Sequence, residues 1–279
     1  MDTPPWSTLL HNDRLATLSN SLSLSMIMTP SDRLVTIEAD TSIKDCLQAM
    51  RNYFDQLPVL ASSDPIGMFF RSSLTKETDP DSLVVDSLTP MVDIASIRSS
   101  ESIGQAIEVL ASNEACMVFD TETGNFGGLI HFSDLNKHPV RIYCYLWISA
   151  IEMSLAELIQ KRLPKLSDWI DCISDHRQVQ ILGRLEYSKR QNIEILPTEG
   201  LDLSDLVNIV AKTEGLRELF KMSKKQFEKR ANRLVDLRNR AMHPVRSLIK
   251  DHSEVERLAT QLADLKSFTR LASELVCSN

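Results

Sequence analysis

The sequence predicts an α+β protein, with a tandem pair of βαββα units in its first half and an all-helical bundle in its second. A pattern of about 60 residues occurs twice before residue 139. Beyond that position no strand pattern persists, and apolar residues recur at helical spacing. The expected parts are an N-terminal segment (1–24), a first copy (25–80), a second copy (81–138) and a helical domain (139–279).

The two copies share the order strand, helix, strand, strand, helix, because the spacing of apolar residues alternates between strand and helix periods. Thr41 in the first copy, and Ser100 or Ser102 in the second, stand just before helical segments and are expected N-caps. The matching segments are 28–30, 34–37, 40–43, 44–53, 57–60 and 67–70 in the first copy, and 88–90, 94–97, 100–103, 104–111, 115–119 and 127–130 in the second.

The repeat resembles a pair of CBS domains, a module in which two copies pack sheet to sheet and commonly bind adenine nucleotides in the clefts between them. The family's closing signature is a glycine, two apolar residues, Ser or Thr, two variable positions and Asp. The second copy reads GLIHFSDL at residues 128–135. It keeps the ribose-binding carboxylate as Asp134 and has His131 where the hydroxyl is expected. The resemblance implies Asp134, His131 and Ser133 as binding residues, and AMP, ADP or ATP as a regulatory ligand.

The first copy departs from the signature, since it reads GMFFRSSL at residues 67–74. Phe70 replaces the hydroxyl and Ser73 replaces the Asp, so at most one intact nucleotide site is expected. A carboxylate at a helix start can accept hydrogen bonds from both ribose hydroxyls while the helix N-terminus faces the phosphate. Two alternatives stay open: Asp134 is favoured there by the helix dipole alone, or the pair is a scaffold without a ligand.

In the second half, apolar residues at helical spacing predict about five helices, which form a bundle. The most apolar stretch, 140–159, carries Arg141, Glu152 and Glu157, so we expect a buried helix and no membrane partner. The predicted helices are 142–159, 178–187, 203–219, 225–241 and 254–276.

One motif in this half suggests a catalytic site. It reads LRNRAMHP at residues 237–244 and contains Arg238, Asn239 and His243. A guanidinium holds phosphate and an imidazole exchanges protons near neutral pH, which is a minimal set for metal-free phosphodiester cleavage. Residues five apart on a helix diverge by about 140°. Pro244 should end the helix near His243, with a new helix from about residue 245, and so allow the two side chains to meet.

A helical domain with Arg, a polar residue and then His after four residues resembles the HEPN superfamily, in which Arg and His line a cleft between two protomers. The resemblance implies a homodimeric, metal-independent endoribonuclease that needs no cofactor for catalysis. His243 would act as general acid or base, Arg238 would bind the phosphate, and Asn239 would orient His243 or the scissile phosphate. Attack by the 2′-hydroxyl requires RNA, expected to be single-stranded, and excludes DNA. A toxin or phage-defence effector fits this reading.

Two non-enzymatic alternatives remain. In the first, Arg238 pairs with an acid such as Glu152, Glu157 or Asp236, and the chain is a non-catalytic, CBS-scaffolded module that binds a partner or regulates it. In the second, the chain is the regulatory subunit of a toxin–antitoxin or phage-defence system with a separate partner chain.

The charge distribution and the cysteines complete the expectations. Residues 1–140 hold 8 Lys+Arg and 19 Asp+Glu, a net of −11, whereas residues 141–279 hold 23 and 19, a net of +4. Residues 212–250 contain 12 basic and 4 acidic side chains, a net of +8, which favours a polyanionic partner. Five scattered cysteines show no zinc or disulfide spacing, so a reducing cytoplasm is expected.

Overall fold

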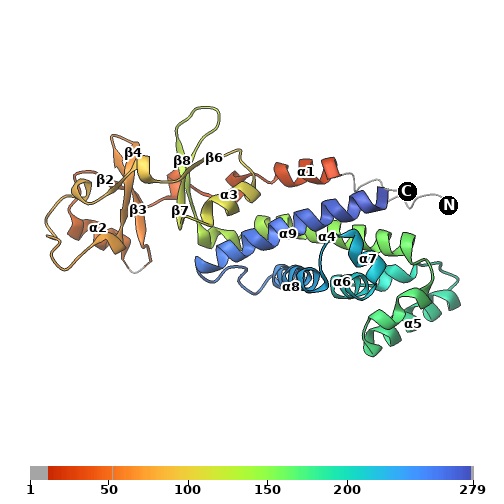
Figure 1. Ribbon diagram of the computed structural model, residues 1–279. Helices are drawn as coiled ribbons and strands as arrows, with labels where there is room; N and C mark the ends of the chain where they lie inside the picture. The colour runs from red at the N-terminus through yellow and green to blue at the C-terminus, as the bar shows by residue number, and fades with distance from the viewer. Residues whose placement is uncertain (1–11, 52, 278–279) are drawn as a thin grey trace. The chain divides into compact units, whose positions relative to one another are not determined.

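The computed structural model describes residues 12–51 and 53–277, and these form two compact units (Figure 1). One unit, within residues 23–135, holds two four-stranded sheets and short helices. The other, formed by residues 12–22 and 136–277, is helical. The mixed architecture predicted from the sequence, with sheets in the first half and helices in the second, is therefore confirmed. The first eleven residues of the expected N-terminal segment lie outside the described residues.

The described residues of the sheet unit form eight short strands, two α-helices and several 3₁₀ turns. In chain order these are η2 (Leu24–Met26), β1 (Thr29–Pro30), η3 (Ser31–Arg33), β2 (Ile37–Glu38), α2 (Ile43–Met50), β3 (Gln56–Ala61), β4 (Asp64–Phe70), η4 (Arg71–Ser73), η5 (Val84–Asp86), β5 (Thr89–Pro90), η6 (Met91–Asp93), β6 (Ser96–Arg98), α3 (Ile103–Leu110), β7 (Ala115–Phe119), β8 (Phe126–His131) and η7 (Phe132–Asn136).

The two copies exchange one strand each. One sheet has the order β2-β3-β4-β5 and the other β1-β8-β7-β6, so β1 of the first copy pairs with β8 of the second, and β5 of the second pairs with β4 of the first. Neither sheet is completed by its own copy alone.

A glycine lies opposite each exchanged strand, Gly128 in β8 beside β1 and Gly67 in β4 beside β5. A Cβ at Gly128 would lie 2.2 Å from the Thr29 carbonyl oxygen, and one at Gly67 would lie 2.3 Å from that of Thr89. Gly128 also has φ +151°, which side chains rarely adopt. The repeated glycine of the sequence pattern is thus required by the close approach of the borrowed strand.

The helices of this unit begin at serines. Ser42, one residue beyond the expected Thr41, caps α2 by accepting a hydrogen bond from the Asp45 N–H at 3.1 Å. Ser102 caps α3 in a capping box with Gln105, as one of the two expected positions predicted. The apolar face of α2 packs on one side of the β2-β3-β4-β5 sheet, and α3 contacts β7.

The opposite faces of the two sheets pack against each other. Their buried core comes from both copies and consists of Met68, Ala115, Met117 and Leu129, with flanking apolar side chains of Leu34, Phe70, Met91, Ile94, Phe119 and Phe126. This confirms the sheet-to-sheet packing that the resemblance implied, and it places the ends of β3 and β8 at the border of one interface.

The expected helix that closes the first copy is wrong for the described residues. After β4 the chain makes only the three-residue 3₁₀ turn η4. Residues 72–81 are mostly Ser, Thr, charged residues and Pro80, without an apolar stripe that could fix a helix on the sheet. The strands expected over 34–37 and 94–97 also start later, at Ile37 and Ser96.

The helical unit is arranged around one long helix, α4. Its elements are α1 (Asn12–Ser21), α4 (His138–Arg162), η8 (Leu166–Asp168), η9 (Ile170–Cys172), α5 (Asp175–Arg190), η10 (Pro197–Gly200), α6 (Leu203–Lys212), α7 (Glu214–Leu219), α8 (Lys224–Ala241) and α9 (Ser253–Cys277). Figure 1 shows α9 lying along α4, which also contacts α1, α6 and α8. The segment expected as one helix over 203–219 is divided at Thr213 into α6 and α7.

By length and composition α4 could also cross a membrane, and it is the one described helix that passes this test. Half of its most apolar window is buried inside the protein. Its Arg141 is 7% exposed and donates hydrogen bonds to backbone carbonyls of the α8 end. These contacts identify α4 as the core helix of the bundle, in agreement with the sequence.

Candidate functional site

The sheet unit contains a cavity of about 420 Å³ at the border of the two packed sheets. Its size lies within the range of small-molecule sites. The walls combine apolar side chains with a few polar ones, and they include all three residues that the second-copy signature predicted. The lining residues are Thr29, Arg33, Leu34, Val35, Tyr53, Phe54, Asp55, Gln56, Leu57, Pro58, Leu129, His131, Ser133 and Asp134.

Asp134 lies in the turn that follows β8. One carboxylate oxygen, Oδ2, accepts a hydrogen bond from the His131 backbone N–H at 2.8 Å. An ionised carboxylate has about four acceptor directions, so this bond fixes the side chain and is compatible with further acceptance. The side chain is half-buried at the edge of the cavity.

His131 is held by its Nδ1 atom. The Ser133 hydroxyl lies 2.8 Å from Nδ1, and the Ser133 backbone N–H donates to the same atom at 3.3 Å. A ring nitrogen that accepts from a backbone N–H carries no proton, so the proton of the neutral ring resides on Nε2. The His131 ring also packs on Phe132, with centroids 4.2 Å apart. Ser133 and Phe132 together fix the orientation of the imidazole.

Two aromatic side chains form the rim of the cavity, on the loop between α2 and β3. Tyr53 is 80% exposed and Phe54 is 41% exposed. Arg71 holds this loop: its guanidinium donates to the carbonyls of Arg51 and Phe54, and its backbone N–H donates to the Asp55 carbonyl at 2.7 Å. The first-copy turn therefore supports the rim of the cleft that the second-copy turn lines.

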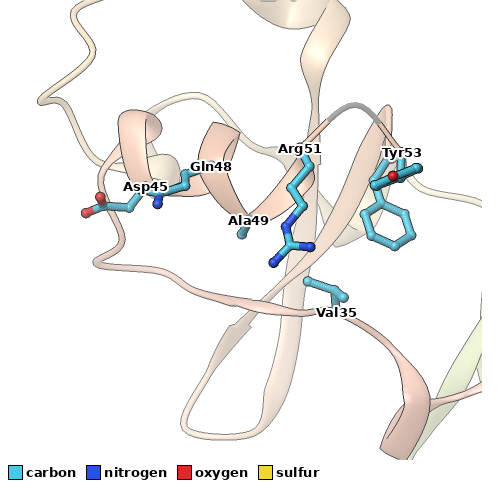
Figure 2. Close-up of a pocket in the computed structure, with 7 residues that line it drawn as sticks. Val35, Asp45, Gln48, Ala49, Arg51 and Tyr53 are labelled. Atoms are coloured by element: carbon cyan, nitrogen blue, oxygen red, sulfur yellow. The ribbon is translucent and has the colours of Figure 1, made fainter.

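A more open groove lies beside the cavity, along α2. Figure 2 shows the Arg51 side chain extending from the end of α2 towards Val35. Asp45, nearer the start of α2, points away from them. Val35, Tyr53 and Phe54 line both hollows. The groove is an extension of the rim, and its exposed lining gives it no arrangement of buried polar groups.

Gln56 is a cavity residue that sequence reasoning missed. It is 7% exposed, and its Oε1 atom is buried without a hydrogen-bond partner among the described residues. A signal was present, because a polar residue opens the apolar strand 57–60 two positions before Pro58, on the same face. That face could not be recognised as a cleft wall before the sheets were placed.

The Arg238–His243 motif lies at the end of α8, in the helical unit. The helix ends at Ala241, which confirms the predicted break near His243. Arg141 of α4 holds the break: it donates to the carbonyls of Arg240 at 2.9 Å, Ala241 at 3.2 Å and His243 at 3.4 Å, and also to that of Arg246. The His243 side chain is exposed.

The helix expected from residue 245 is wrong, because residues 245–252 form a clamped loop and α9 begins at Ser253. Asn136 accepts from the backbone N–H groups of Leu248 and Ile249 at 2.7 and 3.0 Å, and it donates to the Ile249 carbonyl at 2.8 Å. Arg240 donates to the Leu248 carbonyl at 2.8 Å. These bonds satisfy the loop backbone, so no helix is needed to do so.

Arg238 is directed towards Glu152 of α4, with 3.9 Å between Nε and Oε1. Burial raises the pKa of Glu152, Arg238 opposes the rise and Asp202 adds to it. The ion pair is the one that the non-enzymatic alternative expected. Arg238 also donates to the Asn239 side-chain oxygen at 3.4 Å, which brings these two predicted residues together.

Among the described residues, no hydrogen bond joins Arg238 to His243. Arg238 contacts Glu152 of α4, and Arg141 of α4 contacts the backbone carbonyl of His243 rather than its side chain. The catalytic roles of Arg238, Asn239 and His243 stay predictions.

The basic window 212–250 is largely occupied by internal contacts. Seven of its twelve basic side chains contact an acidic side chain or a backbone carbonyl within the helical unit: Lys212, Arg217, Lys224, Arg230, Arg233, Arg238 and Arg240. Asp264 of α9 alone pairs with Arg230 and Arg233. The field available to a polyanion is therefore weaker than the net charge of the segment suggests.

Comparison with known proteins gives one family match: the model described as "CBS domain" matches residues 24–78. No curated protein matches. Solved structures similar in part are the CBS domain of the bacterial CNNM/CorC family Mg²⁺ transporter in complex with ATP (20% identity, 47% of this chain and 94% of that chain, TM-score 0.38) and the CBS-pair protein CBSX2 from Arabidopsis thaliana (19%, 44% and 96%, TM-score 0.39). CBSX2 has also been solved in complex with AMP (20%, 43% and 98%, TM-score 0.37).

The family match ends at residue 78 and does not reach the helical half. The resemblance of that half to the HEPN superfamily therefore stays a prediction. For the first half, the matched residues carry β1 to β4, α2 and the rim of the cavity. Residues 24–78 are thus similar to a CBS domain.

Proposed function

We propose that this chain is a non-catalytic regulatory protein that binds an adenine nucleotide in the cavity of its sheet unit, and that its helical unit binds the regulated partner. The observation that carries the proposal is the convergence of Asp134, His131 and Ser133 on one cavity of about 420 Å³. The same three residues belong to the second-copy signature at residues 128–135.

The chemistry of the cavity suits a nucleotide in three respects. Asp134 supplies a carboxylate that can accept from ribose hydroxyls. Arg33 supplies a permanent positive charge for phosphate, and Thr29 adds a hydroxyl. Leu34, Leu57, Pro58 and Leu129 supply apolar surface for a planar base.

Calorimetric titration of the full chain with AMP, ADP, ATP and adenosine tests the proposal. We expect one nucleotide per chain and weaker binding of adenosine, because Arg33 then has no phosphate to contact. Asp134→Asn should weaken AMP binding about tenfold or more, since hydrogen bonds to charged groups contribute about 1.5–3 kcal/mol. The matched control is Asp64→Asn, an exposed carboxylate at the start of β4.

The proposal fails if none of the four ligands binds at millimolar concentration, or if Asp134→Asn and Asp64→Asn bind AMP equally well. Partner binding by the helical unit requires a second measurement. We expect the full chain to bind a partner protein from the source cell, and we expect that contact to lie within residues 139–279. The affinity between the purified chain and the purified partner should change when AMP is added. An affinity independent of AMP would leave a nucleotide site without a regulatory role.

RNA cleavage by a homodimer is the second candidate. The observation in its favour is the exposed imidazole of His243, displayed on a loop whose backbone Arg141 and Asn136 hold in place. For cleavage, Arg238 would have to exchange its contact with Glu152 for the phosphate, and a second protomer would complete the cleft.

Labelled single-stranded RNA, incubated with the chain in EDTA with and without ATP or AMP, tests this candidate. Active enzyme would leave 2′,3′-cyclic phosphate ends, and His243→Ala would abolish them, whereas His176→Ala, a histidine on α5, would not. Sedimentation velocity would report the dimer. RNA left intact by the wild type, or cut equally by His243→Ala, removes the candidate.

A further inference from the structure

Helix α5 exposes large apolar side chains on its outer face. Val179 is 70% exposed, Leu182 48% and Tyr187 65%. Since each residue turns the helix by about 100°, they lie on the side away from the buried Ile181 and Ser188. The helix packs on η9 and η10, and Figure 1 shows it at the margin of the helical unit. Apolar side chains that gather on one exposed face mark a surface for another molecule.

Gly183 lies in the middle of this outer face, four residues after Val179 and four before Tyr187. Residues four apart on a helix are neighbours on one face. A Cβ at Gly183 would meet no described atom within 4 Å, so internal packing does not require a glycine there. A glycine inside a helix costs about 1 kcal/mol relative to alanine. What it provides is a point where a second backbone can approach the helix closely.

The charges on α5 are opposite at its two ends, because Asp175 begins the helix and Arg190 ends it. Both side chains are exposed. Positions 182 and 183 are the middle of this helix, so a second α5 that crosses it antiparallel there brings Asp175 of each copy next to Arg190 of the other. A parallel pair would instead bring like charges together, which is unfavourable. The charges of α5 therefore complement those of an antiparallel second copy.

We propose that α5 is a self-association surface, on which a second copy of this chain packs its own α5 antiparallel, about a two-fold axis at Gly183. A residue on such an axis meets its own copy, so the missing side chain allows both backbones to approach. Val179 of each copy then lies opposite Tyr187 of the other, and each pair buries apolar surface. The surface shares no residue with the Arg238–His243 motif, and the inference does not depend on nucleotide binding.

Sedimentation velocity of the full chain measures this association. One helix of 16 residues offers a small contact area, so the dimer is expected to be weak. Between about 1 and 200 µM the monomer should convert to a dimer, with a dissociation constant on the order of 10 µM. A wild type that stays monomeric over this range overturns the inference and leaves the α5 face to a helix of another protein.

Gly183→Leu distinguishes a fitted contact from non-specific apolar association. The added apolar surface would strengthen non-specific association, whereas a leucine on the axis would hold the two backbones apart. The dissociation constant should rise about tenfold or more. The fold should remain intact in a thermal melt, because leucine favours the helix and its Cβ meets no described atom within 4 Å. Association of Gly183→Leu that equals or exceeds that of the wild type overturns the inference.

Val179→Lys places a charge on the outer face and should weaken the dimer about tenfold. Its matched control is Val245→Lys, since Val245 is a valine that is 94% exposed in the loop after α8. The control should dimerise as the wild type does. Loss of the dimer in Val245→Lys but not in Val179→Lys would place the contact on another surface and so contradict the inference.

Two charge variants test the antiparallel order. Asp175→Lys and Arg190→Glu each bring like charges together at both ends of the pair. Each variant alone should therefore dimerise about threefold more weakly than the wild type, or worse, at low salt. An equal mixture of the two restores opposite charges at both ends and should form a heterodimer about as tight as the wild-type dimer. A mixture that associates no better than the separate variants overturns the inference.

Calorimetry with AMP keeps this inference separate from the proposed function. The α5 variants should bind AMP as the wild type does, because their changes lie in the helical unit. Failure of self-association leaves the proposed nucleotide site intact. Absence of AMP binding, in turn, overturns the proposed function and leaves the α5 contact intact.

Discussion

The turns that close the two copies have the same place in the fold and opposite roles. After β8, the Asp134 carboxylate accepts from the His131 backbone N–H and lines the cavity. After β4, the Ser73 hydroxyl instead donates to the Phe70 carbonyl at 2.7 Å, and Arg71 reaches back to the loop before β3. One turn thus presents an acceptor to a cavity, whereas the other uses its polar atoms for internal support.

The difference lies in side chains rather than in the backbone path. Both turns are short 3₁₀ segments that follow a strand with a required glycine, Gly67 or Gly128. The two copies supply two equivalent positions, and of these the one after β8 has a carboxylate that lines the cavity. The other position now stabilises the rim of the first, so the two copies form one site together.

The largest effect is expected where the copies are equivalent, at the two glycines. Gly128→Ala and Gly67→Ala should each lower the free energy of unfolding by about 3 kcal/mol, because the new Cβ meets a backbone oxygen that cannot move aside. Gly128→Ala should be the worse because of its positive φ. Urea unfolding followed by circular dichroism measures this.

Gly183→Ala is the matched control for those two variants. Gly183 lies in α5 with nothing within 4 Å of its added Cβ. This change should stabilise the protein by about 0.5–1 kcal/mol, because alanine favours the helix. If Gly128→Ala is as stable as the wild type, the strand exchange does not have the close packing described above.

The next effect comes from giving the second turn the residue of the first. Asp134→Ser should weaken AMP binding about thirtyfold, because the charged acceptor is replaced by a hydroxyl that can bond its own backbone. The reverse change, Ser73→Asp, should leave one nucleotide bound per chain, since Phe70 and Arg71 still occupy the equivalent position. Two bound nucleotides in Ser73→Asp would show that the carboxylate alone decides which turn binds.

A smaller effect is expected from removing the support between the copies. Arg71→Met loses two hydrogen bonds to the carbonyls of Arg51 and Phe54, so it should cost about 1–2 kcal/mol of stability. AMP binding should weaken about threefold, since each 1.4 kcal/mol is a factor of ten and only part of the loss reaches the rim. Lys76→Met, an exposed cation nearby in sequence, is the control and should change neither value.

The smallest expected difference is between the stabilities of the copies, and buried thiols can report it. Burial raises the pKa of Cys46 to about 11, with Arg71 opposing the rise, and burial raises that of Cys116 to about 12. In single-thiol variants both should resist labelling at pH 8 and become reactive at the same urea concentration, because the exchanged strands make the copies unfold together. Reaction of Cys46 at lower urea would show independent unfolding.

The same thiols give a pH dependence. Their folded-state pKa values lie above the ordinary value of 9.0, so the folded state holds their protons more tightly than the unfolded chain does. The stability that they contribute is complete below about pH 9 and is lost as pH rises towards their folded-state pKa values. Urea midpoints between pH 8 and 10 should fall less in variants with Cys46→Ala and Cys116→Ala.

The sequence predicted features that depend on local pattern. The repeat, α2, α3, the core helix α4 and the break after Ala241 all follow from spacing, caps and proline, which act within a few residues. Asp134, His131 and Ser133 lie together on the cavity for the same reason, since a turn motif is contiguous in the chain; their binding role stays a prediction.

Features that depend on distant partners were missed or wrong. The loop over 245–252 replaces an expected helix because Asn136, more than a hundred residues earlier, satisfies its backbone. Arg238 contacts Glu152 of another helix. The sequence could not show which of three acidic residues would be its partner. Gln56 became visible only when two sheets had formed a cavity around it.

The exchange of β1 and β5 determines how this module can be divided. A fragment that ends near residue 80 would lack β5 at the edge of one sheet, and its own β1 would have no β8 to pair with. Such a fragment could complete its hydrogen bonding only by intertwining with another chain, in a domain-swapped assembly. The exchanged strands therefore require both copies in any fragment that is to fold as a single chain.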